Sequence, residues 1–580
     1  MTDVSTLGTG RQPLRAGGRF RVPQVVEHLP LVLLVLGVLG QGIWLIHLLR
    51  TSWFGTDDFN FLTTRGPVPG HDLGLWRPYA GHWSTVPVLL YRALFAVFGM
   101  HSYLPYVAVV VAVHLAEVLV MYALLRSVGA RPWLAAGTGW LLLWYGAGAE
   151  AFMVAAAMNH TVPMLLALIA CLVVVRTDGS ERGLRIAMVL GVVTVMCSAT
   201  GLTMLGLLGG LVALRHGVRS AVRVVAPSLV ALTVWLLLYG RHGGRGSIGL
   251  DDLRLVPSFL WEGLTSAGGV GLGVGRTGGL VLCVALVLVV VQHLGPSALR
   301  ELAVVGAVVA AMQLVLVTLG DAPLGSGIAS SGRYLYVVLF LLAPGIALVA
   351  QVCVDHARDR IDQRRLEPGG RLVPVVIVVT LAALLAAYTW KGVSGERHQA
   401  AINEGSAGVY RTWAYGSLAA VDAGERQLSF QWGFLGAPFE LLASPHLRSR
   451  MPPPPHRDTR LDAEAMWFVQ VGTDDAGMFS PTRISVHGLT GAGARRAGCH
   501  DLTTDGSGPA TIDVPTGSGT EIGLTGNSTQ VTTQLFRRYA PSLTRTWSVA
   551  PGPVYVATSA KDAILRVVLN GSGTMTLCHQ

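Results

Sequence analysis

The sequence predicts a polytopic α-helical membrane protein that ends in a small domain of β-strands. Of its 580 residues, 51% are hydrophobic and only 13% are charged, whereas a soluble protein carries about 25% charged residues. Long apolar segments recur between residues 30 and 390, and short loops that contain arginine separate them. Beyond residue 456 these segments give way to short runs of alternating polar and apolar residues, which are typical of strands.

The basic residues indicate how the chain is oriented in the membrane rather than what it binds. Most of the arginines behind the net charge of +10 lie in short loops between apolar segments, and this distribution does not predict a nucleic-acid partner. The tail, residues 1–29, is predicted to be cytoplasmic because it carries Arg11, Arg15, Arg19 and Arg21. No small-residue cleavage pattern follows the first apolar run, so the tail is not interpreted as a signal peptide.

About eleven membrane spans are predicted, since one span requires roughly 20 apolar residues. Each arginine-rich short loop then falls on the same side, and the loop 355–371 is the strongest inside signal. The short run 86–98 is interpreted as an interfacial helix on the outer surface, and residues 241–278 as a long outer loop. The predicted spans are residues 30–49, 103–125, 133–148, 162–175, two short spans within 186–214, 224–239, 279–291, 302–319, a span that ends at 354, and 372–390.

The chain beyond residue 390 is predicted to lie outside the cytoplasm. Residues 391–455 form a juxtamembrane region that is partly helical and ends in the stiff linker M-P-P-P-P. Residues 456–580 are predicted to form a β-sandwich, because their short alternating runs are separated by Gly, Ser, Asp and Asn. The predicted strands include residues 466–471, 483–486, 530–536, 554–557 and 564–569.

The six cysteines divide into two groups. Cys499 and Cys578 lie in the polar region that faces an oxidising compartment, and they are predicted to form a disulfide. This bond would close a loop that runs from residue 499 to residue 578. In the chain-entropy model, closing a loop of this length stabilises the domain by about 4 kcal/mol. The other four lie in apolar segments and are interpreted as small buried residues: Cys171, Cys197, Cys283 and Cys353.

The candidate catalytic stretch, residues 51–98, directly follows the first apolar segment. It opens with two adjacent acids, Asp57 and Asp58, and continues into aromatic and basic residues and the interfacial helix. This pattern favours a site at the water–lipid boundary, where a lipid-borne substrate would meet a soluble acceptor. The two acids could act as a general base, bind a divalent cation, or do both. The alternative is an ordinary polar loop whose acids pair with Arg65 or Arg77.

Further candidates to line a substrate site lie on the outer side of the predicted topology. They are Arg77, His82, Trp83, Glu150 and His160, although Glu150 and His160 fit better as polar loop residues. No CxxC pair or histidine-rich zinc spacing is present, and the sequence leaves the need for a metal open.

A second candidate site is Arg333 in the segment S-S-G-R-Y-L-Y, at the outer mouth of an apolar span. A guanidinium matches a phosphate and its stem can lie along lipid, so Arg333 is suited to bind a phosphate; the alternative is an interfacial arginine beside tyrosines. His114 and Glu117 share one face of the second span and either carry function or satisfy each other. The glycine-rich run 271–279 follows no predicted strand, so it is not interpreted as a nucleotide loop.

Four segments carry a family resemblance: T-D-D-F-N-F at 56–61, G-H-W-S-T-V-P-V-L-L-Y-R-A-L-F-A-V-F-G-M at 81–100, Y-A-L-L-R-S-V-G-A-R-P-W at 122–133, and S-G-R-Y-L-Y at 331–336. In the order and sidedness of these segments, residues 30–390 resemble the GT-C superfamily of integral membrane glycosyltransferases. The members to which the chain is similar are protein O-mannosyltransferases, lipid A aminoarabinose transferases and actinobacterial arabinofuranosyltransferases.

The resemblance implies inverting transfer of one sugar, with arabinofuranose or mannose favoured, from a polyprenyl-phosphate donor to a cell-envelope glycan outside a bacterial plasma membrane. Asp57 matches the family's catalytic acid and would be the general base, with Asp58 as its partner for the acceptor or a cation. Many relatives carry Asp-Glu there, so the role of Asp58 stays open. Arg333, with Tyr334, would hold the donor phosphate. The arabinofuranosyltransferase branch has a β-rich outer domain that binds glycan.

Two other classes of protein compete with this interpretation. A transporter or flippase for a lipid-linked saccharide would need binding groups near the membrane midplane and two matching halves. The break within residues 186–214 and Glu117 are its only hints. A glycan-binding envelope protein without catalysis would need the membrane part only as an anchor, and about eleven spans are more than an anchor requires.

Overall fold

The computed structural model describes the helical part of the chain almost continuously and the C-terminal part as strands. The described residues are 24–63, 74–79, 81–240, 250–270, 273–364, 372–422, 431–432, 437–438, 444–452, 484–488, 499–504, 510–516, 520–526, 530–537, 540–541, 545–548, 554–558, 563–569 and 573–578. Most of the predicted cytoplasmic tail, Arg65 and the predicted strand 466–471 therefore lie outside the described residues.

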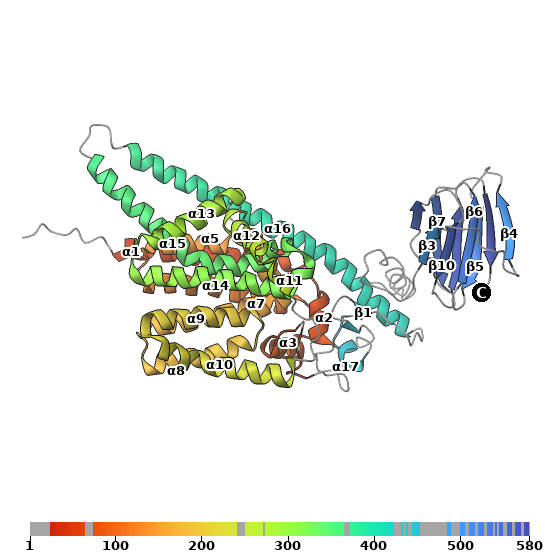
Figure 1. The fold of residues 1–580 in the computed structure, drawn as a ribbon, viewed down its shortest axis with the longest axis horizontal. Coiled ribbons are helices and arrows are strands. Elements are labelled where there is room, and N and C mark those ends of the chain that lie inside the picture. Colours follow the sequence, from red (N-terminus) through yellow and green to blue (C-terminus); the bar gives the residue numbers. More distant parts are fainter. Residues whose placement is uncertain are drawn as a thin grey trace, which may run out of the picture.

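Long apolar helices pack side by side into one helical body (Figure 1). Within the described residues, six helices are long and apolar enough to cross a membrane, and the chain is a multi-pass membrane protein. These six lie on α1 (Gln24–Leu49), α4 (Leu104–Ser127), α7 (Met158–Arg176), α10 (Val218–Leu238), α14 (Ser297–Asp321) and α15 (Gly332–Arg364).

Helices also form at the other predicted spans, and four of them are shorter than the roughly 20 residues of a typical span. The helix α5 has only 12 residues and rises about 18 Å, against roughly 30 Å of hydrocarbon. The predicted number of about eleven spans is thus not shown by the helices that the structure describes. The short helices are α5 (Pro132–Leu143), α8 (Glu181–Val195), α9 (Thr200–His216) and α13 (Gly275–Val291).

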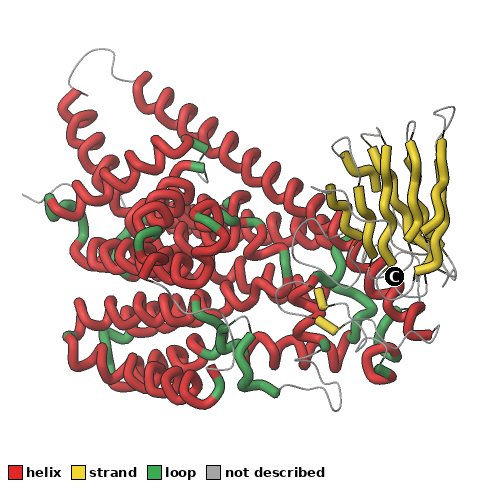
Figure 2. The backbone as a smooth tube through the Cα atoms, turned by 45° about the vertical axis from the view of Figure 1, so that its right-hand side comes forward, coloured by secondary structure: helices red, strands yellow, loops and turns green. Residues whose placement is uncertain are grey.

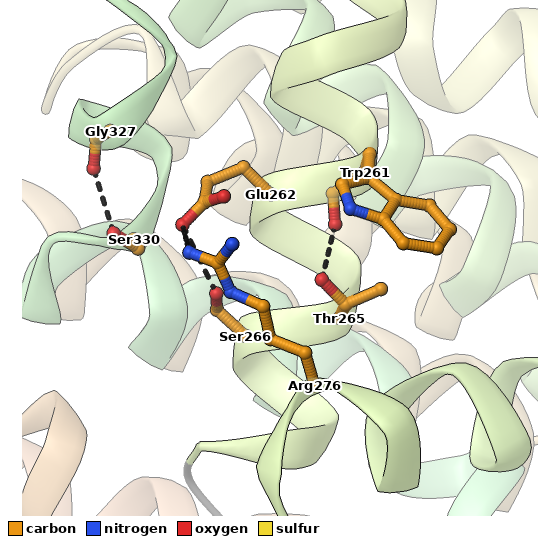
Figure 3. Close-up of polar contacts among 7 residues, drawn as sticks. All are labelled: Trp261, Glu262, Thr265, Ser266, Arg276, Gly327 and Ser330. Atoms are coloured by element: carbon orange, nitrogen blue, oxygen red, sulfur yellow. Dashed lines mark hydrogen bonds and ion pairs between the residues drawn. The ribbon is translucent and has the colours of Figure 1, made fainter.

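The predicted long outer loop is wrong over residues 250–269, where the chain forms α11 (Leu250–Leu253) and α12 (Val256–Gly269). The small residues of α12 allow α13 to approach its backbone closely. A Cβ atom added at Gly279 would lie 2.2 Å from the carbonyl oxygen of Thr265. Figure 3 shows the ion pair between Arg276 of α13 and Glu262 of α12 that closes this hairpin beside η5 (Ser326–Ser330).

The last helix, α16 (Leu372–Asp422), continues as one helix of 51 residues far beyond the span predicted at 372–390. Figure 1 shows it running along the helical body to the end where α2 (Thr56–Leu62) and α3 (Thr85–Phe98) lie. Glu396 pins α16 to α1, because its carboxylate accepts hydrogen bonds from Gln41 Nε2 at 2.7 Å and Trp44 Nε1 at 2.9 Å. Burial raises the pKa of Glu396 to about 7, although the hydrogen bonds from Gln41 and Trp44 lower it.

The predicted helix at 86–98 is present as α3, which is amphipathic. Its buried face carries Pro87, Val88, Tyr91 and Phe95 and packs on α2 and α4, whereas Leu89 and Val97 are exposed. The same end of the helical body holds the short helices α6 (Glu150–Met153), η1 (Gly146–Gly148) and η2 (Ala155–Ala157).

Strands follow in the C-terminal part, drawn in yellow in Figure 2. They form two five-stranded antiparallel sheets, with the order β3-β10-β6-β12-β4 in one and β5-β11-β7-β8 in the other, where β9 also pairs with β7. The predicted runs at 483–486, 530–536, 554–557 and 564–569 coincide with β3, β7, β10 and β11. The strands of these sheets are β3 (Ile484–Gly488), β4 (Cys499–Thr504), β5 (Ala510–Thr516), β6 (Thr520–Gly526), β7 (Gln530–Arg537), β8 (Ala540–Pro541), β9 (Arg545–Ser548), β10 (Val554–Thr558), β11 (Ala563–Leu569) and β12 (Gly573–Cys578).

The register of β4 and β12 places Cys499 directly opposite Cys578. Opposed residues of antiparallel strands have Cα atoms about 4.5–5.5 Å apart, a separation that a disulfide can bridge. We expect the intact chain to gain two alkylated thiols after reduction, in addition to those that react beforehand, and peptide mass spectrometry to locate them at these two residues. Equal alkylation of Cys499 and Cys578 without reductant would contradict the disulfide.

The four remaining cysteines differ in their surroundings. Cys171 and Cys197 are buried, as predicted, whereas Cys283 is half-buried and Cys353 is exposed on α15. The interpretation of Cys353 as a buried residue is therefore wrong, because its side chain points out of the helical body.

Candidate active site

The two adjacent acids lie at the start of α2, directly after the first long helix. The side chain of Asp58 accepts a hydrogen bond from the backbone N–H of Gly55 at 2.6 Å and so caps the first turn. Acids are favoured at a helix N-terminus because the free N–H groups carry partial positive charge. Because α2 is helical, Asp57 and Asp58 point in directions about 100° apart and enter different surroundings.

Asp58 is a buried acid whose oxygens are held by the protein. It is only 1% exposed, and the hydroxyl of Tyr91 on α3 donates a hydrogen bond to its Oδ1. The hydroxyl of Tyr103, just before α4, forms a further hydrogen bond with it. Burial raises the pKa of Asp58 to about 7, although the hydrogen bonds from Gly55, Tyr91 and Tyr103 act in the opposite direction. Asp58 thus joins α2, α3 and α4.

The raised pKa of Asp58 predicts how the stability of the protein depends on pH. Between pH 4 and pH 7 the folded state holds a proton that the unfolded state has lost, so the free energy of unfolding falls as the pH rises through this range. The total loss in the free energy of unfolding is at most about 4 kcal/mol, and it is complete once the pH exceeds the pKa of Asp58 in the folded state. We expect the difference in unfolding temperature between the wild type and Asp58→Asn, measured in detergent, to shift in favour of the variant from pH 4 to pH 8. A difference that is constant with pH would contradict this assignment.

Asp57 is exposed, and a single tyrosine orients it. The hydroxyl of Tyr79 donates a hydrogen bond of 2.6 Å to its Oδ1. Tyr79 is itself fixed, because its ring packs on Phe61 at 4.7 Å between centroids and its backbone exchanges two hydrogen bonds with His82, at 2.8 and 2.7 Å. The acid that remains accessible is thus the one that the sequence assigned as the base.

Both acids open into a cavity of about 420 Å³. Its lining comes from the segment before α2, from α2, from Tyr103, from α6 and η2, and from α16. The lining residues are Ser52, Trp53, Gly55, Asp57, Asp58, Tyr103, Glu150, Met153, Val154, Ala156, Gln399, Ile402, Asn403, Ser406 and Tyr410. A cavity of this size accommodates one or two sugar rings.

Arg333 lies next to this cavity, at the first turn of α15. Its backbone N–H donates to Glu150 Oε2 at 3.3 Å, and its NH1 atom is 3.7 Å from Glu150 Oε1, a loose ion pair. Its guanidinium carbon lies 5.1 Å from the ring centroid of Tyr334, whose hydroxyl donates to Asp321. The Nε atom of Arg333 is buried without a hydrogen-bond partner in the described part of the chain.

Electrostatic interactions link Arg333 to the acid site. Its charge interacts with Glu150, Asp321 and Asp57, and His160 interacts with both Arg333 and His82. His160 accepts or donates a hydrogen bond to Thr200 Oγ1 at 2.9 Å and its ring meets that of Tyr334 edge-on at 6.1 Å. The fold therefore gathers Asp57, Glu150, His160 and Arg333, which lie far apart in the sequence.

Two of the candidates predicted from the sequence, Trp83 and Arg77, lie outside the linings of the described cavities. Trp83 is buried and stacks on Trp235 of α10 at 5.5 Å, and it lines neither described cavity. Arg77 is exposed on the segment before α3 and is likewise absent from both linings. His82 contacts the site in two ways: its backbone is hydrogen-bonded to the backbone of Tyr79, and it interacts electrostatically with His160.

Three of the carboxylate oxygens of the acid pair accept hydrogen bonds from the protein. They are both oxygens of Asp58 and the Oδ1 atom of Asp57, which accepts from Tyr79. In the part of the chain that the structure describes, no group of three or more His, Cys, Asp or Glu side chains is arranged to hold a metal.

His114 and Glu117 are joined within the helical body by a third residue. The hydroxyl of Tyr336 on α15 lies 2.6 Å from His114 Nδ1 and donates to Glu117 Oε2. Tyr336 thus bridges the two groups, while His114 Nε2 and Glu117 Oε1 are buried without a hydrogen-bond partner among the described residues.

Sequence reasoning missed the wall that α16 contributes. Gln399, Asn403, Ser406 and Tyr410 recur at helical spacing and all line the cavity of the two acids. Their spacing was a usable signal, because polar uncharged residues repeat on one helical face directly after an apolar span.

Comparison with known proteins finds similarity among solved structures. No family model matches the sequence. No curated protein matches it either. The crystal structure of ArnT from Cupriavidus metallidurans bound to undecaprenyl phosphate is 14% identical, with a TM-score of 0.39, and the match covers 73% of this chain and 90% of that chain. At this level of similarity we infer the function from the side chains of the site rather than from the match.

Proposed function

We propose that this chain is an inverting glycosyltransferase of the bacterial plasma membrane. It moves a single sugar from a polyprenyl-phosphate donor to a cell-envelope glycan outside the cytoplasm. The observation that carries the proposal is an exposed acid, Asp57, oriented by Tyr79 at the rim of a cavity and close to the arginine of another helix. The motifs at 56–61 and 331–336 support the same class of enzyme, because their resemblance to GT-C glycosyltransferases falls on these residues.

The geometry suits a single displacement with inversion. The acceptor hydroxyl oxygen attacks the anomeric carbon while Asp57 removes the hydroxyl proton, and the bond from that carbon to the phosphate oxygen breaks. The departing polyprenyl phosphate gains negative charge, which Arg333 neutralises. Arg333 suits this role because its pair with Glu150 is loose and its buried Nε atom can donate to a phosphate oxygen.

Asp58 acts as a positioning residue in this scheme. Its bonds to Gly55 and Tyr91 hold the first turn of α2, and with it Asp57, against α3. Tyr334, bound to Asp321, holds the Arg333 guanidinium at its ring face. Arabinofuranose and mannose remain the favoured sugars, and we propose that the C-terminal strands, as a β-sandwich, bind glycan.

Transfer by the purified protein in detergent tests the proposal. The assay offers radiolabelled polyprenyl-phosphate sugars, including arabinofuranose and mannose, together with cell-envelope acceptors. We expect transfer from at least one donor, with a product whose anomeric configuration, read by NMR, is inverted relative to the donor. Binding of a lipid-linked sugar without transfer from any donor would contradict the enzyme and favour a flippase, which an assay of flipping in proteoliposomes then measures.

A further inference from the structure

The residues that α16 contributes to the cavity of Asp57 and Asp58 are largely polar, and none carries a charge. Gln399, Asn403, Ser406 and Tyr410 occupy positions i, i+4, i+7 and i+11, so one face of the helix presents two amides and two hydroxyls. All four side chains are half-buried. A face of this kind offers both donors and acceptors, which is the chemistry that recognises hydroxyl groups.

The amides of this wall are held in place before any ligand arrives. Gln399 Nε2 donates to Asn403 Oδ1 at 2.9 Å, and Asn403 Nδ2 donates to the backbone oxygen of Met153 at 2.9 Å. This chain of hydrogen bonds connects α16 directly to α6 at the cavity. Binding groups that are already ordered lose little entropy when a ligand binds.

Ser52 gives a second, independent indication of a ligand. It lines the same cavity and is only 6% exposed. Its hydroxyl oxygen has no hydrogen-bond partner among the residues that the structure describes. Buried hydroxyls without partners are uncommon, because an unsatisfied polar group costs about 1–3 kcal/mol.

The charges around the cavity decide what kind of ligand fits. The described lining includes three acids, Asp57, Asp58 and Glu150, and it includes no Lys, Arg or His. A neighbouring cavity of about 400 Å³ shares Glu150 and Gln399 but contains Lys391 and His398. Because its described lining has acids and no basic side chain, the first cavity favours a neutral ligand over an anionic one.

We propose that the acid-lined cavity is the acceptor subsite and that it binds the uncharged, hydroxyl-rich end of a glycan through Gln399 and Ser406 of α16. The inference rests on the proposed function and extends it, because it names the acceptor as a neutral saccharide and excludes acceptors with a phosphate or carboxylate at the reacting end. The acceptor hydroxyl then lies between the α16 wall and Asp57.

Binding of neutral and acidic oligosaccharides to the full chain in detergent tests the inference without requiring catalysis. The probes are pentasaccharides of arabinofuranose and of mannose, and a pentasaccharide of galacturonic acid, with affinities from saturation-transfer NMR. The variant is Gln399→Met combined with Ser406→Ala, and the control is Glu404→Met, an exposed residue of α16 outside the lining. Asn403 stays unchanged because it anchors α16 to Met153.

We expect at least one neutral pentasaccharide to bind the wild type and the control alike, and about tenfold more weakly to the double variant, the loss expected for one or two neutral hydrogen bonds. The C-terminal strands are identical in the wild type, the control and the double variant, so glycan binding there contributes equally to all three. Equal affinity of the double variant, binding of the galacturonic acid probe as tight as the neutral ones, or no neutral probe bound by the wild type would overturn the inference.

The proposed function and this inference fail separately. If the protein transfers sugar, the double variant should raise the KM for the acceptor about tenfold and leave the KM for the lipid donor unchanged. Unchanged acceptor KM in an active enzyme refutes the subsite alone. Selective neutral binding that depends on Gln399 and Ser406, in a protein that transfers nothing, retains the cavity as a glycan site and refutes the transferase.

Discussion

Asp57→Asn should abolish sugar transfer while the protein stays folded. Asparagine keeps the shape of the side chain and its hydrogen bond from Tyr79, but it cannot accept the proton of the acceptor hydroxyl. General-base catalysis contributes about 10²–10⁴-fold, so the rate of transfer should fall by roughly a thousandfold. The measurement is transfer by wild type and variant at saturating donor and acceptor.

The same chemical change at an exposed position away from the site provides the control. Asp178→Asn lies in the turn between α7 and α8, where Asp178 is exposed with φ of 47°, a conformation that asparagine tolerates. This control should keep full activity. If Asp57→Asn keeps more than about a third of the activity and Asp58→Asn loses it, the base is Asp58 and the roles of the two acids are reversed.

Gly392→Leu should detach α16 from the helical body. A Cβ atom added at Gly392 would lie 2.2 Å from the carbonyl oxygen of Trp144, and one added at Gly146 would lie 2.5 Å from the oxygen of Gly392. Backbone atoms cannot move aside as a flexible side chain can, so α16 must shift. We expect a loss of about 3–5 kcal/mol in stability, measured as a fall in unfolding temperature in detergent.

Gly405→Leu on the same helix is the matched control. Nothing lies within 4 Å of a Cβ atom at Gly405, and leucine favours helix over glycine by about 1 kcal/mol. This variant should be as stable as the wild type or more so. If both variants lose equal stability, the close contact between α16 and the segment at Trp144 is not what holds the helix.

Much of the helical body follows from the sequence, because local composition decides it. Apolar runs predict α1, α4, α7 and α14 within a few residues, and the amphipathic run at 86–98 predicts α3. The placement of Asp57 and Asp58 directly after the first span, and of Arg333 at the mouth of another, also follows from order along the chain. An exception is α12, which was predicted as part of a loop and which packs closely on α13 through its small residues.

The tertiary structure shows that the two acids have different surroundings, and it completes the site. Adjacent residues of one type are equivalent in the sequence, but Asp58 lies buried against Tyr91, whereas Asp57 is exposed beside Tyr79. The polar face of α16 repeats along the sequence, but its docking against the cavity depends on contacts such as Gln41 with Glu396, 355 residues apart. Composition and hydrophobic period act over one helix, and they determined that this is a membrane protein with acids at its boundary. Burial, charge and cavity shape arise from groups that meet only on folding, and they decided which acid is exposed and which residues line the cavity beside it.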